Sequence, residues 1–367
     1  MRRTDEEIQK LLREEVEPVY VELSSKIGEA DSPIMPRVFK SLADLEEANI
    51  LNMIESPIEK IVEKLGLDKE TVEKQIQVMF ERGLVMPGKS GWHLTRSWGS
   101  LHDNAASSNP KYDNDEFFDL AFVKSEETHQ KNRIDPVLRG ERSAVRQIMR
   151  VVPRWKSIKD IPGVMPCEDI REIFKGADPI VVVNCACKKI DRSRECQDTI
   201  PTETCVTNRR SGQYNLNRGA GRQLSYEELL ELFDELDQHP LVHLTGNTNS
   251  MSPLICNCHS CCCGIFQSSA KTKAQLNQLT LAKSRFIAAV DPEKCRGCKI
   301  CVSRCPIGAA QMKHYSEYGE ERAYIDTDEC IGCGLCVLTC PTEAREMRLV
   351  RPPEHIPEPG GLPYATG

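Results

Sequence analysis

The first third of the chain carries apolar residues at helical spacing. A helix is predicted over Lys69–Arg82, because apolar side chains recur on one of its faces. These side chains are Val72, Ile76, Met79 and Phe80. Similar signals predict helices before it and a two-stranded hairpin after it. Those elements cover Ser41–Ile54, Ser56–Leu65 and Gly83–Leu94.

With three helices followed by a hairpin, the stretch Ile50–Leu101 resembles a winged helix-turn-helix. DNA binding by such a domain needs an excess of Lys and Arg on its recognition helix. Here the acidic and basic side chains of the third helix cancel. They are Glu70, Glu73 and Glu81 against Lys69, Lys74 and Arg82. We therefore expect the domain to make protein contacts and consider DNA binding the weaker hypothesis.

The stretch 102–160 is predicted to be a linker of helix and loop. Arginines recur through its second half, which fits either a solvated helix face or a dock for an acidic partner. They are Arg133, Arg139, Arg142, Arg146, Arg150 and Arg154.

In the middle of the chain, apolar runs lead directly into cysteines. Pro179–Asn184 is predicted to be a buried strand, and Ser225–Gln238 a helix with a capping box of Ser225 and Glu228. A second strand is predicted over Leu241–Leu244. This order of strand, helix and strand predicts an α/β domain. In such a domain, cysteine loops at strand ends converge on one edge of the sheet.

The C-terminal part is built on a repeated pattern. A strand is predicted over Ser284–Asp291, and a hairpin of Gln311–His314 and Ala323–Asp326 around Gly319. The residues after Arg351 are rich in proline and glycine, which predicts an extended arm rather than a helix.

Cysteine content, charge and the length of apolar runs exclude several classes of protein. The chain has 367 residues, 18 cysteines and a formal net charge of −7. Its first residues are charged and include no apolar segment, so we expect no export leader, a cytoplasmic location and reduced thiols that bind metal. Apolar runs are too short to span a bilayer, so no membrane insertion is expected. Negative charge and few aromatics do not favour nucleic acid.

Two cysteine runs of identical spacing, C-x₂-C-x₂-C-x₃-C-P, lie near the C-terminus. This is the spacing of bacterial two-cluster ferredoxins, in which the fourth cysteine of each run ligates the other cluster. Two [4Fe–4S] clusters are therefore predicted. The first is assigned to Cys295, Cys298, Cys301 and Cys340. The second is assigned to Cys330, Cys333, Cys336 and Cys305.

Residues between these cysteines have predicted roles of their own. Gly297 and Gly332 are expected to let the backbone curl tightly around each cluster. Four apolar side chains are expected to keep water from the clusters. They are Ile300, Ile307, Ile331 and Leu335.

Ten further cysteines precede the two runs, and Cys167 among them is expected to be a core residue. Soft thiolates select iron–sulfur clusters or zinc. Zinc sites favour paired C-x₂-C, whereas C-x-C recurs here, so at least one additional [4Fe–4S] cluster is predicted. The stronger candidate ligands are Cys185, Cys187, Cys196 and Cys205.

A second group could complete that cluster, hold another, or form a redox or substrate site. It consists of Cys256, Cys258, Cys261, Cys262 and Cys263. His259 is a possible ligand, although a neighbour that tunes the reduction potential is the favoured interpretation.

These motifs carry a resemblance to known families. The stretch Phe286–Leu349 resembles a bacterial-type ferredoxin throughout. From about Ile50 to Leu349, the layout resembles 4Fe-4S dicluster proteins of anaerobic bacteria and archaea, many of which carry Cys where this chain has His259. The resemblance implies a multidomain α+β fold with an N-terminal winged helix, a middle α/β cysteine-rich domain and a C-terminal 2×[4Fe–4S] ferredoxin fold.

The predicted domains follow from these patterns. They are a helical arm (1–40), the winged helix (41–101), the linker (102–160), the cysteine-rich domain (161–283), the ferredoxin domain (284–350) and the tail (351–367).

The resemblance implies electron transfer within an anaerobic oxidoreductase system. The chain has no nucleotide-binding fingerprint, so any flavin is expected on a partner, a larger redox subunit containing flavin or metal. Two alternatives stay open. One is a redox-sensing transcription regulator that uses the winged helix. The other is an iron–sulfur enzyme that binds substrate at the loop Cys256–Cys263, with catalytic residues unknown.

Overall fold

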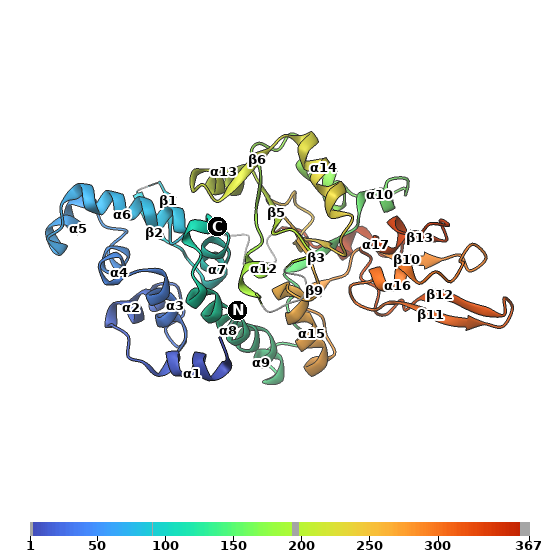
Figure 1. The fold of residues 1–367 in the computed structure, drawn as a ribbon, viewed down its shortest axis with the longest axis horizontal. Helices are drawn as coiled ribbons and strands as arrows, with labels where there is room; N and C mark the ends of the chain where they lie inside the picture. Colours follow the sequence, from blue (N-terminus) through green and yellow to red (C-terminus); the bar gives the residue numbers. More distant parts are fainter. Residues whose placement is uncertain (1–2, 90, 193–197, 360–367) are drawn as a thin grey trace. The chain divides into compact units, whose positions relative to one another are not determined.

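The computed structural model describes residues 3–89, 91–192 and 198–359 (Figure 1). It divides into two compact units, each assembled from separate stretches of the chain. The first unit comprises Met1–Asn132, Val183–Glu203 and Tyr214–Arg222. The second unit comprises Arg133–Val182, Thr204–Gln213 and Gln223–Gly367.

Helices dominate the start of the first unit. They are α1 (Asp5–Arg13), α2 (Pro18–Lys26), α3 (Met35–Leu42), α4 (Leu45–Asn52), α5 (Ile58–Leu65), α6 (Lys69–Arg82), α7 (Trp98–Ala106) and α8 (Asp115–His129). Strands β1 (Val85–Gly88) and β2 (Gly91–Leu94) form an antiparallel hairpin after α6. The helix predicted over 41–54 begins too early, because Asp44 and Glu47 form a capping box that starts α4 at Leu45.

Helix α6 has the bounds that the sequence predicts. The Asp68 side chain accepts a hydrogen bond from the Thr71 N–H at its start, and Gly83 ends it in the left-handed conformation. The predicted apolar face is buried. Three helices and a hairpin thus follow one another as a winged helix requires, while the winged-helix assignment itself stays a prediction.

The segment 102–160, predicted as a linker, instead contributes to both cores. Helix α8 buries Phe117, Phe118 and Leu120 in the apolar cluster of the first unit. The shorter elements that follow are a π-helix over Gln130–Ile134, α9 (Asp135–Leu138), β3 (Met149–Val152) and α10 (Trp155–Ile158). The helices and loops expected for this segment are present, and its apolar side chains also pack into the cores.

A seven-stranded sheet has the strand order β6-β4-β5-β8-β7-β3-β9. The remaining strands are β4 (Ile180–Asn184), β5 (Glu203–Asn208), β6 (Gly221–Leu224), β7 (Val242–Gly246), β8 (Leu254–Cys258) and β9 (Leu281–Ala282). The neighbours β3/β7, β7/β8 and β5/β8 are antiparallel, and β3/β9 is parallel. The expected convergence of cysteine loops at one edge of the sheet requires parallel strands, and it does not hold for these antiparallel pairs. The connection 247–253 is too short for the crossover that parallel strands need.

Helices cover both faces of this sheet in the second unit. Helix α14 (Tyr226–Leu236) starts at the predicted capping box of Ser225 and Glu228, and its Phe233 packs against His243 of β7. Helix α15 (Gly264–Leu276) buries Phe266 on the opposite face, in one cluster with Val242 and Leu244. The other helical elements in this region are the 3₁₀ turn Pro166–Glu168, α11 (Ile170–Phe174), α12 (Ala186–Ile190) and α13 (Arg209–Asn217).

The C-terminal part contains two antiparallel strand pairs, drawn in orange and red in Figure 1. Strand β10 (Phe286–Val290) pairs with β13 (Arg345–Leu349), and β11 (Ala310–Tyr315) pairs with β12 (Glu320–Ile325). Short helices α16 (Ile300–Arg304) and α17 (Leu335–Leu338) lie in the cysteine runs. The predicted strand and hairpin are thereby confirmed. A 3₁₀ turn over Pro353–His355 interrupts the arm that was predicted to be extended.

Two of the six regularly spaced arginines are buried, so neither surface interpretation applies to them. Arg150 lies in β3 and donates hydrogen bonds to the carbonyl oxygens of Cys167 and Thr248. Arg154 follows the same strand and is also buried. Their spacing of four residues suggested one face of a helix. In the structure, Arg150 lies in strand β3 and Arg154 lies just before helix α10. Within the described part of the chain, no helix is both long and apolar enough to cross a membrane.

Candidate iron–sulfur centres

Both cysteine runs turn at a glycine in the left-handed conformation. Gly297 has φ 65° and Gly332 has φ 72°. A Cβ atom on Gly297 would lie 2.7 Å from the Glu321 carbonyl oxygen, and one on Gly332 would collide with the Phe286 carbonyl oxygen. The glycines are thus needed for the backbone conformation and for close approach to neighbouring strands.

The second cysteine run lines a small pocket. Its lining includes Cys330, Cys333 and Cys336, together with Cys305 from the first run. The chain therefore brings the last cysteine of one run to the first three of the other, as the crossed pattern of ferredoxins requires. Apolar neighbours complete the lining, among them Ile307, Ile331 and Leu335. Four thiols in an apolar cavity fit a [4Fe–4S] cluster, and the assignment of these ligands stays a prediction.

The protonation of these thiols reflects their surroundings. Burial raises the pKa of Cys333 to about 12, and burial raises that of Cys336 further. Neighbouring thiols of Cys305 and Cys330 act in the same direction. Thiolates are therefore disfavoured in the metal-free cavity and need the positive charge of iron to form.

The first run has one exposed end. Cys295 and Cys301 are buried, whereas Cys298 is exposed. Ile300 is 42% exposed, so the prediction that it shields a cluster from water is wrong. It lies at the first position of α16 and points away from the core that holds Cys301.

Cys340, the fourth predicted ligand of this cluster, has hydrogen-bond donors next to its sulfur. The Ala344 N–H donates to the Cys340 Sγ at 3.3 Å. Burial raises the pKa of Cys340, but hydrogen bonds from Thr342 and Ala344 outweigh it and leave the pKa below the ordinary value. This environment favours a thiolate.

The middle cysteines meet across strands rather than in loops at one sheet edge. Cys205 of β5 lies directly opposite Cys256 of β8 in an antiparallel pair. Cys258 lies two residues further along β8, so its side chain shares the face of Cys256. The predicted meeting of these cysteines therefore arises from antiparallel register, which the sequence order alone did not indicate.

The thiols on this face are close to one another. Cys258 is buried, and hydrogen bonds with Cys256 and Cys263 together with burial raise its pKa well above the ordinary value. Cys263 precedes the first residue of α15, where helical N–H groups favour negative charge. Three thiols in contact, one of them at a helix start, form a donor set suited to soft metal ions.

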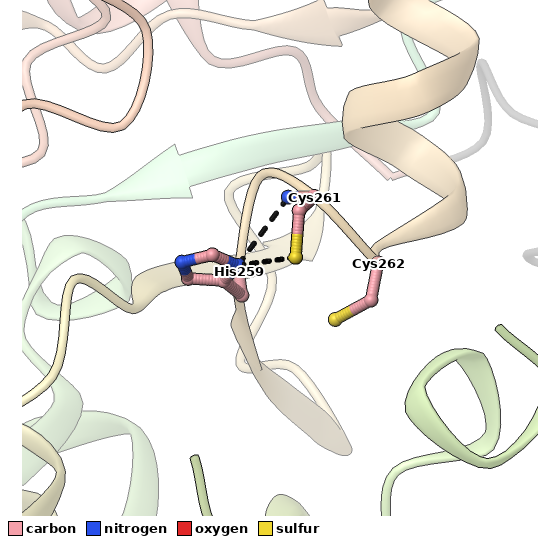
Figure 2. A group of neighbouring side chains, drawn as sticks. All are labelled: His259, Cys261 and Cys262. Atoms are coloured by element: carbon pink, nitrogen blue, oxygen red, sulfur yellow. Dashed lines mark hydrogen bonds between the residues drawn. The ribbon is translucent and has the colours of Figure 1, made fainter. Parts of the chain in front are cut away.

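A second donor group lies in the loop between β8 and α15. The ligand atoms of His259, Cys261 and Cys262 all lie within 4.8 Å of one another. Figure 2 shows the His259 ring facing Cys261, with its Nδ1 atom 2.8 Å from the Cys261 Sγ. The sequence favoured His259 as a tuning neighbour, and this geometry fits a ligand equally well.

The remaining predicted ligands are distributed as follows. Cys185 precedes α12 and Cys187 lies in its first turn, both within the first unit. Ala186 and Ile190 of that helix belong to the apolar core of the first unit, to which the two cysteines do not contribute. Cys196 lies outside the described residues. Cys167 is buried, as predicted for a core residue, and burial raises its pKa.

The sequence analysis missed a buried polar chain that links the two cysteine regions of the second unit. The Arg154 N–H donates to the Cys333 carbonyl oxygen at 3.0 Å, and the Arg154 guanidinium contacts His243 Nε2 at 2.8 Å. His243 Nδ1 lies 2.5 Å from the Asn257 Oδ1, and Asn257 donates to the Thr204 carbonyl oxygen at 2.7 Å. In the sequence, the one hint of this series is Asn257, a polar residue placed between Cys256 and Cys258.

The charges of the side chains decide which atoms donate and which accept along this hydrogen-bonded series. Burial lowers the pKa of Arg154 to about 10, so Arg154 is still charged at neutral pH, and its carboxylate partner is Asp237 at 2.8 Å. Burial and the Arg154 charge lower the pKa of His243 well below its ordinary value. A neutral His243 accepts from Arg154 at Nε2 and donates from Nδ1 to Asn257.

Comparison with known proteins agrees with this geometry. A family model described as a 4Fe-4S dicluster domain matches residues 294–344, which include both cysteine runs. The comparison with curated proteins gives no match for the chain. The C-terminal part is thus a ferredoxin-like iron–sulfur domain in a mixed α/β, multidomain protein. Such a domain indicates iron–sulfur electron transfer.

Proposed function

We propose that this protein is an iron–sulfur electron-transfer protein or subunit of an anaerobic oxidoreductase complex. It carries two ferredoxin [4Fe–4S] clusters and at least one further cluster bound by the middle cysteines. Each cluster, when bound, takes up and releases single electrons. The chain's own residues supply the thiol ligands and most of the apolar surroundings of these centres.

One observation carries this proposal. A single apolar cluster in the second unit contains residues from both cysteine regions. From the middle segment it contains Cys256, Cys258 and Cys263. From the ferredoxin domain it contains Ile331 and Leu335. Apolar packing between two redox sites excludes water and holds them at a fixed separation. Cys256, Cys258 and Cys263 are thus close to the second ferredoxin run, as an electron relay requires.

The exposed end of the ferredoxin domain indicates where a partner exchanges electrons with this relay. Among its described cysteines, only Cys298 is exposed, while the second run packs against the middle cysteines. A partner can therefore approach the Cys298 end, and the middle site lies at the opposite end of the relay. The exposed Ile300 beside Cys298 offers an apolar contact for that partner.

The proposed partner is a larger redox subunit that contains flavin or metal. The proposal rests on the absence of a nucleotide-binding fingerprint in the sequence. Anaerobic affinity purification from the native source should recover this subunit with the chain. Recovery of the chain alone, combined with turnover of a substrate by the chain alone, would refute the subunit proposal.

Iron and sulfide analysis tests the cluster content. After anaerobic purification and reconstitution, we expect about twelve iron atoms per chain, from three [4Fe–4S] clusters. About eight would limit the protein to its ferredoxin clusters, and about sixteen would mean two clusters in the middle segment. Electron paramagnetic resonance of the reduced protein gives an independent count of spins per chain.

A second function is favoured by the loop between β8 and α15. His259, Cys261 and Cys262 form a mixed nitrogen and sulfur donor group that is only partly buried. Such a group suits a metal site with an open position for substrate, as in the enzyme hypothesis. Replacement of His259 by Ala would abolish turnover in an enzyme while leaving electron transfer through the ferredoxin clusters unchanged.

A further inference from the structure

Arg345 is a buried cation without a carboxylate partner. It is the first residue of β13, opposite Val290 of β10, and it is only 5% exposed. Its NH2 atom donates to the Cys301 Sγ at 2.7 Å. Within the described part of the chain, its NH1 atom is buried and has no hydrogen-bond partner, and no Asp or Glu lies within ion-pair distance.

A buried guanidinium in these surroundings needs a negative charge nearby. Burying an ion without a partner is strongly unfavourable, because the ion loses its hydration and gains nothing in return. The groups around Arg345 that can carry negative charge are thiols. The thiols of Cys301, Cys336 and Cys340 all lie within range of its charge, and Cys301 is the one that the guanidinium contacts directly.

These three cysteines belong to both cysteine runs. Cys301 and Cys340 are predicted ligands of the first cluster, and Cys336 is a predicted ligand of the second. Arg345 therefore lies beside the ligands of both clusters, close to Cys340 in the chain and hydrogen-bonded to Cys301. Pairing of β13 with β10 fixes its backbone, and burial together with the hydrogen bond to Cys301 holds the guanidinium in place.

We propose that Arg345 is the internal counter-charge of the two ferredoxin clusters and raises their reduction potentials, most strongly that of the cluster bound by Cys301. Each electron that enters a cluster adds one negative charge. A fixed positive charge within a few ångströms stabilises the reduced state more than the oxidised state. Hydrogen bonds from N–H groups to cluster sulfurs act in the same direction. The inference rests on the proposed function, because it requires clusters in both runs.

Arg345→Gln and Arg345→Lys test this role. Arg348→Gln is the matched control, because Arg348 lies on the same strand but is 63% exposed and paired with Glu346. Each variant is loaded anaerobically and checked for full iron content. Midpoint potentials are then measured by redox titration monitored by electron paramagnetic resonance.

We expect the Gln variant to favour the oxidised state of the Cys301 cluster by about tenfold, a fall of about 59 mV for one electron. The Lys variant keeps the charge and should remain nearer to the unaltered protein. The control should not change. If Arg345→Gln does not assemble, Arg345→Met serves as the second neutral variant.

Two results would overturn the proposal. One is an unchanged potential in a fully loaded neutral variant, and the other is an equal fall in the Lys and Gln variants, which would exclude the charge as the cause. Failure of the proposed function is distinguishable. It would appear as fewer than about eight irons per chain in the unaltered protein, before any variant is made.

Discussion

Cys258 offers the clearest test of whether a middle cysteine is a metal ligand or an ordinary core residue. It contacts the thiols of Cys256 and Cys263 and lies in the apolar cluster shared with the ferredoxin domain. Cys258→Ser should therefore remove one cluster, lowering the iron content by about four per chain, while both ferredoxin clusters keep their spins. Iron analysis and spin counting measure the two effects.

Cys167→Ser is the control for that experiment. Cys167 is as deeply buried, and its carbonyl oxygen accepts a hydrogen bond from Arg150, but charged side chains such as Glu168 surround its thiol instead of other thiols. Its replacement should leave all iron in place. Loss of iron from Cys167→Ser, or full iron in Cys258→Ser, would show that the middle site is assigned wrongly. The same measurement on Cys187→Ser decides whether the first group of middle cysteines also binds a cluster.

Strands β3, β7 and β8 are joined by the buried chain of Arg154, His243 and Asn257. Because each member depends on the next, His243→Phe and Asn257→Leu should each cost about 1–3 kcal/mol of stability by leaving a buried polar group without its partner. The double variant should lose less than the sum, since neighbouring groups couple by about 0.5–3 kcal/mol. Midpoints of guanidinium-induced unfolding of the loaded protein provide the comparison.

His314→Phe serves as the matched substitution, because His314 lies on the exposed face of β11. It should leave the unfolding midpoint unchanged. Strictly additive losses from His243→Phe and Asn257→Leu would contradict the idea of a coupled chain. An effect confined to Asn257 would assign the stabilisation to its bond with the Thr204 carbonyl oxygen alone.

The elements that the sequence predicts well are those whose signals are local. Helix α6 is bounded by Asp68 and Gly83, and α14 by its capping box at Ser225, so periodicity and caps were sufficient. The pairing of Cys205 with Cys256 depends on strand direction, a non-local property that no residue nearby in sequence encodes. The buried Arg154 was missed for the same reason, because its partners come from distant strands.

At the level of the whole molecule, the two units differ in what holds them together. The apolar cluster of the first unit is built from aliphatic and aromatic side chains, with no cysteine among its described members. The cluster of the ferredoxin part includes Cys295, Cys301, Cys330 and Cys336. Its helices α16 and α17 have five and four residues, too few to be stable alone. The ferredoxin motif could be predicted because its loops encode the metal site directly.

Removal of iron should therefore unfold one part of the protein and spare the other. After anaerobic chelation, we expect trypsin to cleave within 284–350, because the thiols there lose the iron that draws the loops together. The helices of Met1–Asn132 should stay protected by their own apolar core. Fragments identified by mass spectrometry before and after chelation measure this difference. Equal protection of both regions in the iron-free protein would show that packing alone holds the ferredoxin part, and equal cleavage would show that the first unit also depends on metal.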